Sequence, residues 1–137
     1  MKGFVPTPRK TVDTMVDLLF RVRAPTADNT VLDPGCGTGE FIDGIVRWCQ
    51  RRRIQVPRIT GVESDPHHLP ALRAKYGRLP FVYIEHADFL ESDGKSYDYI
   101  IGNPPYVPIT ELSEGEKARY RTRYATAQRR FDLYLYE

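Results

Sequence analysis

The chain lacks most of the sequence features that mark secreted, membrane-spanning and zinc-binding proteins. Its only cysteines are Cys36 and Cys49, too few for a disulfide framework, so a reducing cytoplasm is the predicted location. No apolar run approaches the length of a membrane-spanning helix, and residues 1–6 lack the apolar core of a signal peptide. The three histidines, His67, His68 and His86, lack the spacing and companion ligands of a zinc site.

A large excess of charge of either sign is also missing. Lys and Arg number 20 and Asp and Glu number 18, for a net charge of +2 and a pI of about 8.6. Overall electrostatics therefore do not indicate a nucleic-acid partner. The local distribution is less even, because six basic residues and no acidic ones lie between Lys117 and Arg130. Two interpretations fit this segment: contact with phosphates, and the solvated face of a helix.

Predicted strands and helices alternate along the chain, which is typical of α/β proteins with a parallel sheet. The predicted strands are 30–33, 58–63, 81–86 and 97–102, and the predicted helices are about 10–22, 40–52, 66–76 and from about 114 onward. Crossovers are right-handed and ligands bind where strand order reverses. We therefore expect strand order 3-2-1-4, helices on both faces and a ligand at the carboxyl edge. The last strand would leave an exposed edge for self-association.

A glycine-rich loop joins the first predicted strand to the helix at 40–52. Gly35, Gly37 and Gly39 lie within five residues, and such glycines allow positive φ and close approach of the backbone to a ligand. The loop predicts a nucleotide-like ligand, although an ordinary strand-to-helix turn is the alternative. Asp33 precedes the loop and would repel a pyrophosphate, so a cationic ligand such as S-adenosylmethionine (SAM) fits better.

Acidic residues also follow the next two predicted strands. Glu63 lies about 24 residues after Gly39, near the position where an acid accepts hydrogen bonds from ribose hydroxyls. A helix-capping or solvated Glu63 is the alternative. Asp88 could accept a hydrogen bond from an adenine amino group while Phe89 packs on the ring. The alternative for these two residues is a strand-end turn with a core phenylalanine.

The segment Asn103-Pro104-Pro105-Tyr106 follows the apolar run at 99–102. Its two prolines fix φ and remove two backbone donors, so nearby carbonyls are free to accept hydrogen bonds from a ligand. Asn103 adds an amide oxygen and Tyr106 adds a ring face. The segment therefore predicts a pocket for a planar amine.

These motifs, in this order, resemble those of the SAM-dependent amino-methyltransferases, most closely the adenine-N6 DNA methyltransferases of bacterial restriction-modification systems in the gamma arrangement. The resemblance extends from Thr7-Pro8 to Phe131-Asp132-Leu133-Tyr134. It implies a Rossmann-like SAM-dependent methyltransferase fold, truncated after about four strands. Residues 1–137 would then be an N-terminal part of the catalytic domain without the region that reads DNA, and a free-standing minimal module is the alternative.

The resemblance also implies roles for individual residues. The implied cofactor-binding residues are Thr7, Pro8, Asp33, Gly35, Cys36, Gly37, Gly39, Glu63, Ser64, Asp88 and Phe89. The implied catalytic residues are Asn103, Pro104, Pro105 and Tyr106. The implied reaction moves a methyl group from SAM to the amino group of an adenine flipped out of double-stranded DNA, without a metal. Methylation of a protein glutamine or of an RNA adenine, and SAM binding without turnover, are the alternatives.

Overall fold

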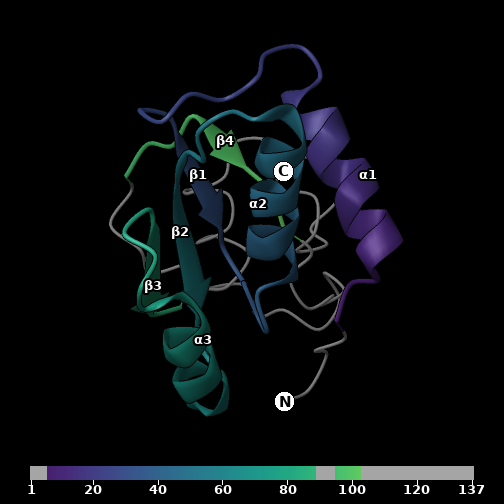
Figure 1. Cartoon of the computed structure of the whole chain (residues 1–137). Helices are drawn as coiled ribbons and strands as arrows, with labels where there is room; N and C mark the ends of the chain where they lie inside the picture. The colour runs from purple at the N-terminus through teal and green to yellow at the C-terminus, as the bar shows by residue number, and fades with distance from the viewer. Residues whose placement is uncertain (1–5, 89–94, 103–137) are drawn as a thin grey trace, which may run out of the picture.

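The computed structural model of this chain describes residues 6–88 and 95–102 (Figure 1). The Asn103-Pro104-Pro105-Tyr106 segment, Phe89, the basic segment from Lys117 to Arg130 and the helices predicted from residue 114 lie outside the described residues. The helices and strands are α1 (Arg9–Phe20), β1 (Thr30–Asp33), α2 (Glu40–Arg52), β2 (Arg58–Glu63), the 3-10 helix η1 (Pro66–His68), α3 (Leu69–Tyr76), β3 (Val82–His86) and β4 (Tyr99–Ile100).

The four strands form one parallel sheet in the order β3-β2-β1-β4, as predicted. In its register Asp33 lies opposite Gly61 and Glu63 lies opposite His86, so the carboxyl ends of β1, β2 and β3 share one edge. The arrowheads of β1 and β2 point to the lower end of the molecule in Figure 1, where α2 begins and α3 lies. This edge is where the sequence predicts the ligand.

Two predicted elements differ in extent from the structure. The strand predicted at 97–102 is assigned only at Tyr99–Ile100, although the N–H groups of Asp98 and Ile101 also bond to β1, at Thr30 and Leu32. The helix predicted at 66–76 begins with the 3-10 turn η1. Pro70 has no N–H to donate to the Pro66 carbonyl, so a regular α-helical turn cannot begin there.

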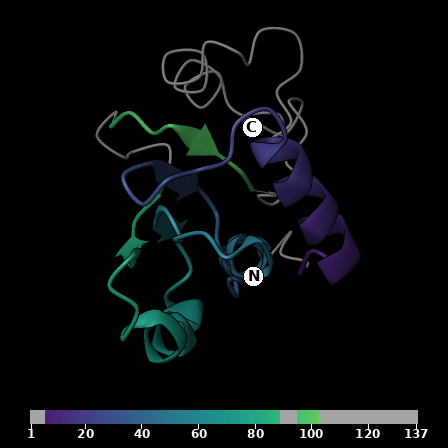
Figure 2. The ribbon, with the colours of Figure 1, turned by 45° about the horizontal axis from the view of Figure 1, so that its top comes forward.

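Helices α1 and α2 pack side by side on one face of the sheet (Figure 2). Val12, Val16 and Phe20 recur every four residues on α1 and are buried against α2. Gly44 of α2 has no side chain, and a Cβ there would overlap Cγ1 of Val12, so the helices approach closely at this point. The Phe20 ring lies 5.0 Å from the ring of Trp48, which completes this part of the core.

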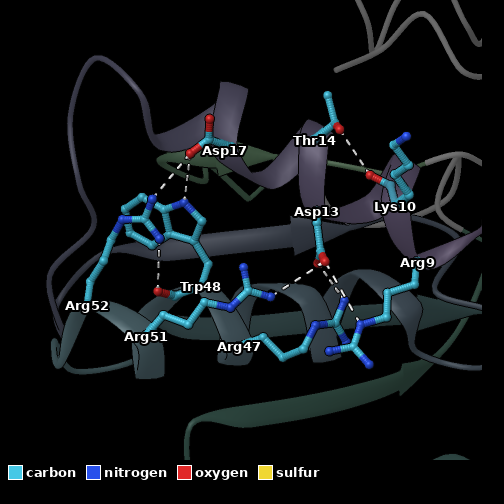
Figure 3. A network of polar contacts seen from close by, with 9 residues as sticks. All are labelled: Arg9, Lys10, Asp13, Thr14, Asp17, Arg47, Trp48, Arg51 and Arg52. Atoms are coloured by element: carbon cyan, nitrogen blue, oxygen red, sulfur yellow. Dashed lines mark hydrogen bonds and ion pairs between the residues drawn. The ribbon is translucent and has the colours of Figure 1, made fainter.

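Polar contacts add to this helix pair (Figure 3). Asp13 accepts a hydrogen bond of 2.6 Å from Arg47, and this bond holds the pKa of Asp13 below its usual value. Asp17 accepts hydrogen bonds of 3.3 Å from Trp48 Nε1 and from the guanidinium of Arg52, which lies 3.8 Å from the Trp48 ring centroid. Asp13 contacts Arg47, and Asp17, which lies further along α1, contacts Trp48 and Arg52, which lie further along α2. The two helices therefore run in the same direction. Thr7 and Pro8, which precede α1, therefore lie at the same end of the helix pair as the glycine loop.

Candidate functional site

Three predicted ligand-binding acids come from neighbouring strands at the carboxyl edge. Asp33 is the last residue of β1 and is fully buried, and Glu63 is the last residue of β2 with 3% of its surface exposed. Asp88 is half-buried and follows β3, where the Ala87 N–H donates to the Glu63 carbonyl at 3.1 Å. The sheet therefore brings together acids that are 55 residues apart in sequence, from 33 to 88.

The glycine loop folds back onto the end of β2. The Cys36 N–H donates to the Val62 carbonyl at 2.9 Å, and the Gly39 N–H donates to the Cys36 carbonyl at 2.8 Å. Gly37 and Gly39 have φ values of 56° and 92°, in the left-handed region that favours glycine. The alternating glycines predicted this backbone shape, but the strand on which the loop rests depends on the tertiary structure.

Glu63 organises this loop directly. Its Oε1 atom accepts a hydrogen bond of 2.7 Å from the Gly37 N–H, and its Oε2 atom accepts one of 2.8 Å from the Asp65 N–H. Nδ1 of His68 lies 3.5 Å from Oε2. Each carboxylate oxygen has two lone pairs, so these contacts leave acceptor capacity for ribose hydroxyls. Asp65 and His68 were not predicted to belong to the site.

The Cys36 side chain packs against the sheet. A Cβ added at Gly61 would lie 3.0 Å from Cys36 Sγ and 3.1 Å from Ile42 Cδ1, so the bare backbone of β2 makes room for the thiol. Burial raises the pKa of Cys36 well above its usual value, and the negative charges of Asp33 and Glu63 raise it further. The same negative charges favour a cationic ligand at this edge over a pyrophosphate.

The chain segment that leaves β4 passes beside Asp33. A Cβ added at Gly102 would lie 2.9 Å from Asp33 Oδ1 and 3.2 Å from Cδ of Pro34. The backbone therefore reaches the carboxyl edge immediately before Asn103, the first residue of the predicted catalytic segment. The placement of Asn103 itself lies outside the described residues.

The other predicted residues that the structure describes, Thr7, Pro8, Gly35 and Ser64, lie at the same end of the molecule. Thr7 is buried and Pro8 exposed just before α1, Gly35 is half-buried in the loop, and Ser64 is exposed directly after Glu63. Within residues 6–88 and 95–102, no group of three or more His, Cys, Asp or Glu residues could hold a metal ion. The helices in this part of the chain include none long and apolar enough to cross a membrane.

These residues fit SAM as a ligand. Carboxylates at the ends of β1, β2 and β3 can accept hydrogen bonds from hydroxyl, ammonium and amino groups, and they suit a positive centre. The glycine loop brings backbone close to the ligand, and the N–H groups of the first turn of α2 are donors without intrahelical acceptors. Asp33 and Glu63 would contact the methionine and ribose parts, and Asp88 the adenine.

Comparisons with known proteins show which sequences and folds this chain is similar to. Residues 71–136 match the family model of the Eco57I restriction-modification methylase. The modification methylase CviBIII of Paramecium bursaria Chlorella virus NC1A is 40% identical over 78 residues, covering 57% of this chain and 19% of that protein. The type II methyltransferase M.TthHB8I of Thermus thermophilus is 32% identical over 140 residues, covering 96% of this chain and 29% of that protein.

A solved structure supports the fold assignment. A protein of Listeria monocytogenes assigned to the class I S-adenosylmethionine-dependent methyltransferases superposes with a TM-score of 0.64 at 16% identity, covering 98% of this chain and 41% of that one. The chain spans between about a fifth and three tenths of the two curated relatives. Its sequence is similar to those of restriction-modification methylases, and its described part has the Rossmann-like fold of SAM-dependent methyltransferases.

Proposed function

We propose that this chain is the cofactor-binding part of a DNA methyltransferase that transfers a methyl group from SAM to the N6 amino group of adenine. The observation that carries the proposal is that Gly102, the residue that precedes Asn103, lies beside Asp33, on the same edge of the sheet as Glu63 and the glycine loop. Because Asn103 directly follows Gly102 in the sequence, we propose that the acceptor site lies next to the donor site. The similarity to restriction-modification methylases supports DNA as the substrate class.

SAM, when bound, supplies an electrophilic methyl group on a sulfonium centre. Glu63 would hold the ribose while it keeps the loop in place through Gly37. Asp33, fully buried beside Gly102, would orient the methionine part at the point where the catalytic segment begins. Thr7 and Pro8 would close over the methionine part.

The catalytic segment would prepare the acceptor nitrogen. The adenine amino group is a weak nucleophile because its lone pair is delocalised into the ring. The Asn103 side-chain oxygen and the Pro104 carbonyl would accept hydrogen bonds from the two amino hydrogens and draw the nitrogen toward tetrahedral geometry. Positioning and electrostatics would then supply the rate enhancement. Tyr106 would stack on the flipped base, which offsets part of the cost of a few kcal/mol for extrusion from the duplex.

Two measurements test this proposal. Calorimetry should detect SAM binding, and incubation of the whole methyltransferase with tritiated SAM and unmethylated DNA should give N6-methyladenine by nucleoside mass spectrometry. Asn103→Ala should abolish transfer and leave the SAM dissociation constant within a few-fold. An equally large loss of SAM binding would contradict the role of Asn103, and N4-methylcytosine as the product would contradict the choice of adenine.

The alternatives give different outcomes in the same assays. Label transferred to a glutamine-containing protein or to RNA, with none in DNA, would replace DNA as the substrate. SAM binding without transfer by residues 1–137, together with transfer by a longer protein, would make this chain a cofactor-binding module. The partial-domain assignment, the cytoplasmic location and self-association through the β4 edge stay predictions.

A further inference from the structure

Two residues at the end of α3, Lys75 and Tyr76, contact the glycine loop from a third element. Tyr76 is buried, and its hydroxyl lies 2.9 Å from the Gly39 carbonyl oxygen and 2.6 Å from Oδ1 of Asp43. Lys75 Nζ lies 2.5 Å from Oδ2 of Asp43 and 3.5 Å from the Thr38 carbonyl oxygen. These contacts cover the half of the loop that does not rest on β2.

The Tyr76 hydroxyl acts here as a hydrogen-bond donor, and its single hydrogen is shared between Oδ1 of Asp43 and the Gly39 carbonyl oxygen. Burial, and then the hydrogen bond with Asp43, raise the pKa of Tyr76 far above its usual value, so the phenol stays protonated. The Gly39 carbonyl also accepts the Asp43 N–H at 2.9 Å, the first hydrogen bond of α2. The C=O and N–H of one trans peptide unit point in opposite directions. Fixing the Gly39 carbonyl therefore also fixes the Glu40 N–H, which points out of the N-terminal end of α2.

The contact is too close for any residue other than glycine at position 39. A Cβ there would overlap the Tyr76 hydroxyl and would lie 2.8 Å from two carbons of the Tyr76 ring. The φ of 92° independently disfavours a side chain. The ring of Tyr76 thus packs directly on the backbone that turns the loop into α2.

We propose that Tyr76, supported by Lys75 and Asp43, is a positioning residue for the cofactor loop. It fixes the Gly39 peptide and the first turn of α2, while Glu63 fixes Gly37, so the loop is held from both sides before a ligand arrives. If the loop is already ordered, less conformational entropy is lost when the ligand binds, and the affinity is higher. The inference rests on the proposed function for the identity of that ligand, SAM.

The test compares Tyr76→Phe with Tyr83→Phe in the full chain. Both remove one phenolic hydroxyl, but Tyr83 is 62% exposed on β3. Tyr76→Phe should raise the SAM dissociation constant about three- to tenfold, the usual effect of losing one hydrogen bond. In the ligand-free protein it should also speed amide exchange at Gly39 and Asp43 by a similar factor and leave Ile59 of the sheet unchanged. Tyr83→Phe should change neither quantity.

Each outcome decides the inference. A folded Tyr76→Phe variant with unchanged exchange at Gly39 and Asp43, or with faster exchange and unchanged SAM affinity, would overturn it. If that variant does not fold, Lys75→Met replaces it, because Lys75 is 47% exposed, and a SAM affinity equal to wild type would overturn the inference. If wild-type protein does not bind SAM, the proposed function fails. The ligand-free exchange measurement then still decides whether Tyr76 holds the loop.

Discussion

Replacing Asp13 by Asn should destabilise the chain by about 1–2 kcal/mol at pH 7. A hydrogen bond to a charged group contributes about 1.5–3 kcal/mol, and an exposed ion pair about 0.2–1 kcal/mol. The Asp13–Arg47 pair lies between these cases, because 30% of the Asp13 side chain and 23% of the Arg47 side chain are exposed. Arg51 and Arg9 lie 3.6 Å and 3.9 Å from Oδ2 of the same carboxylate, so the substitution also weakens their attraction to residue 13 (Figure 3).

The pH dependence gives a sharper test. The hydrogen bond from Arg47 lowers the pKa of Asp13 below its ordinary value of 3.8. A group whose pKa is lower in the folded state stabilises fully above its unfolded-state pKa, and the stabilisation is lost as pH falls through the folded pKa. The free-energy difference between wild type and Asp13→Asn should therefore be full at pH 7 and pH 5 and smaller at pH 3 and below.

Urea unfolding followed by the fluorescence of Trp48, the single tryptophan, measures this difference. The matched control is Asp28→Asn, because Asp28 is 94% exposed and its ion pair with Arg58 spans 3.7 Å. The control should change stability by less than about 0.5 kcal/mol. Equal effects of the two substitutions, or a difference for Asp13→Asn that grows toward pH 3, would refute the reasoning.

Three further predictions concern the loop and the buried thiols. Gly39→Ala should lower the free energy of unfolding, measured by urea denaturation, by about 2–4 kcal/mol, because alanine is strained at a φ of 92° and its Cβ would overlap Tyr76. An unchanged free energy of unfolding would contradict the tight contact. Glu63→Ala should weaken SAM binding by about 1–3 kcal/mol in calorimetry, with Glu85→Ala as the control, and unchanged affinity would remove Glu63 from the site. Cys36 and Cys49 should react with a thiol reagent at pH 8 only as fast as the chain unfolds, because burial raises the pKa of both thiols, that of Cys49 to about 11. Rapid labelling of the native protein would contradict this prediction, because it would show that the thiols are accessible.

The sequence pattern predicted the bounds of some helices and strands better than those of others. The strands at 30–33 and 58–63 and the helix at 40–52 have the predicted bounds. The third strand begins at Val82, one residue later than predicted, and α1 ends at Phe20, two residues early. Val22 is 96% exposed, so no buried contact holds a further turn of α1 in place.

Some residues of the candidate site could be predicted from the sequence, and others could be found only in the tertiary structure. Asp33, Glu63 and the glycines could be picked out because their residue types and spacing carry a chemical meaning. Asp65, Lys75 and Tyr76 could not, because a tyrosine at the end of a helix has no distinguishing pattern until its partner is known. The importance of Gly61 and Gly102 could not be predicted either, because it depends on their tertiary neighbours. Gly61 leaves room for the Cys36 side chain, and Gly102 allows the backbone to pass close to Asp33.

The sequence by itself determined the strand and helix pattern, the strand order and the set of acids at strand ends, because backbone preferences and right-handed crossovers act locally or by general rule. Only the tertiary structure decided that Glu63 holds Gly37, that α3 holds Gly39 and that the chain reaches Asp33 immediately before Asn103. These contacts join residues 26 to 69 positions apart, and their existence depends on how helices pack on the sheet.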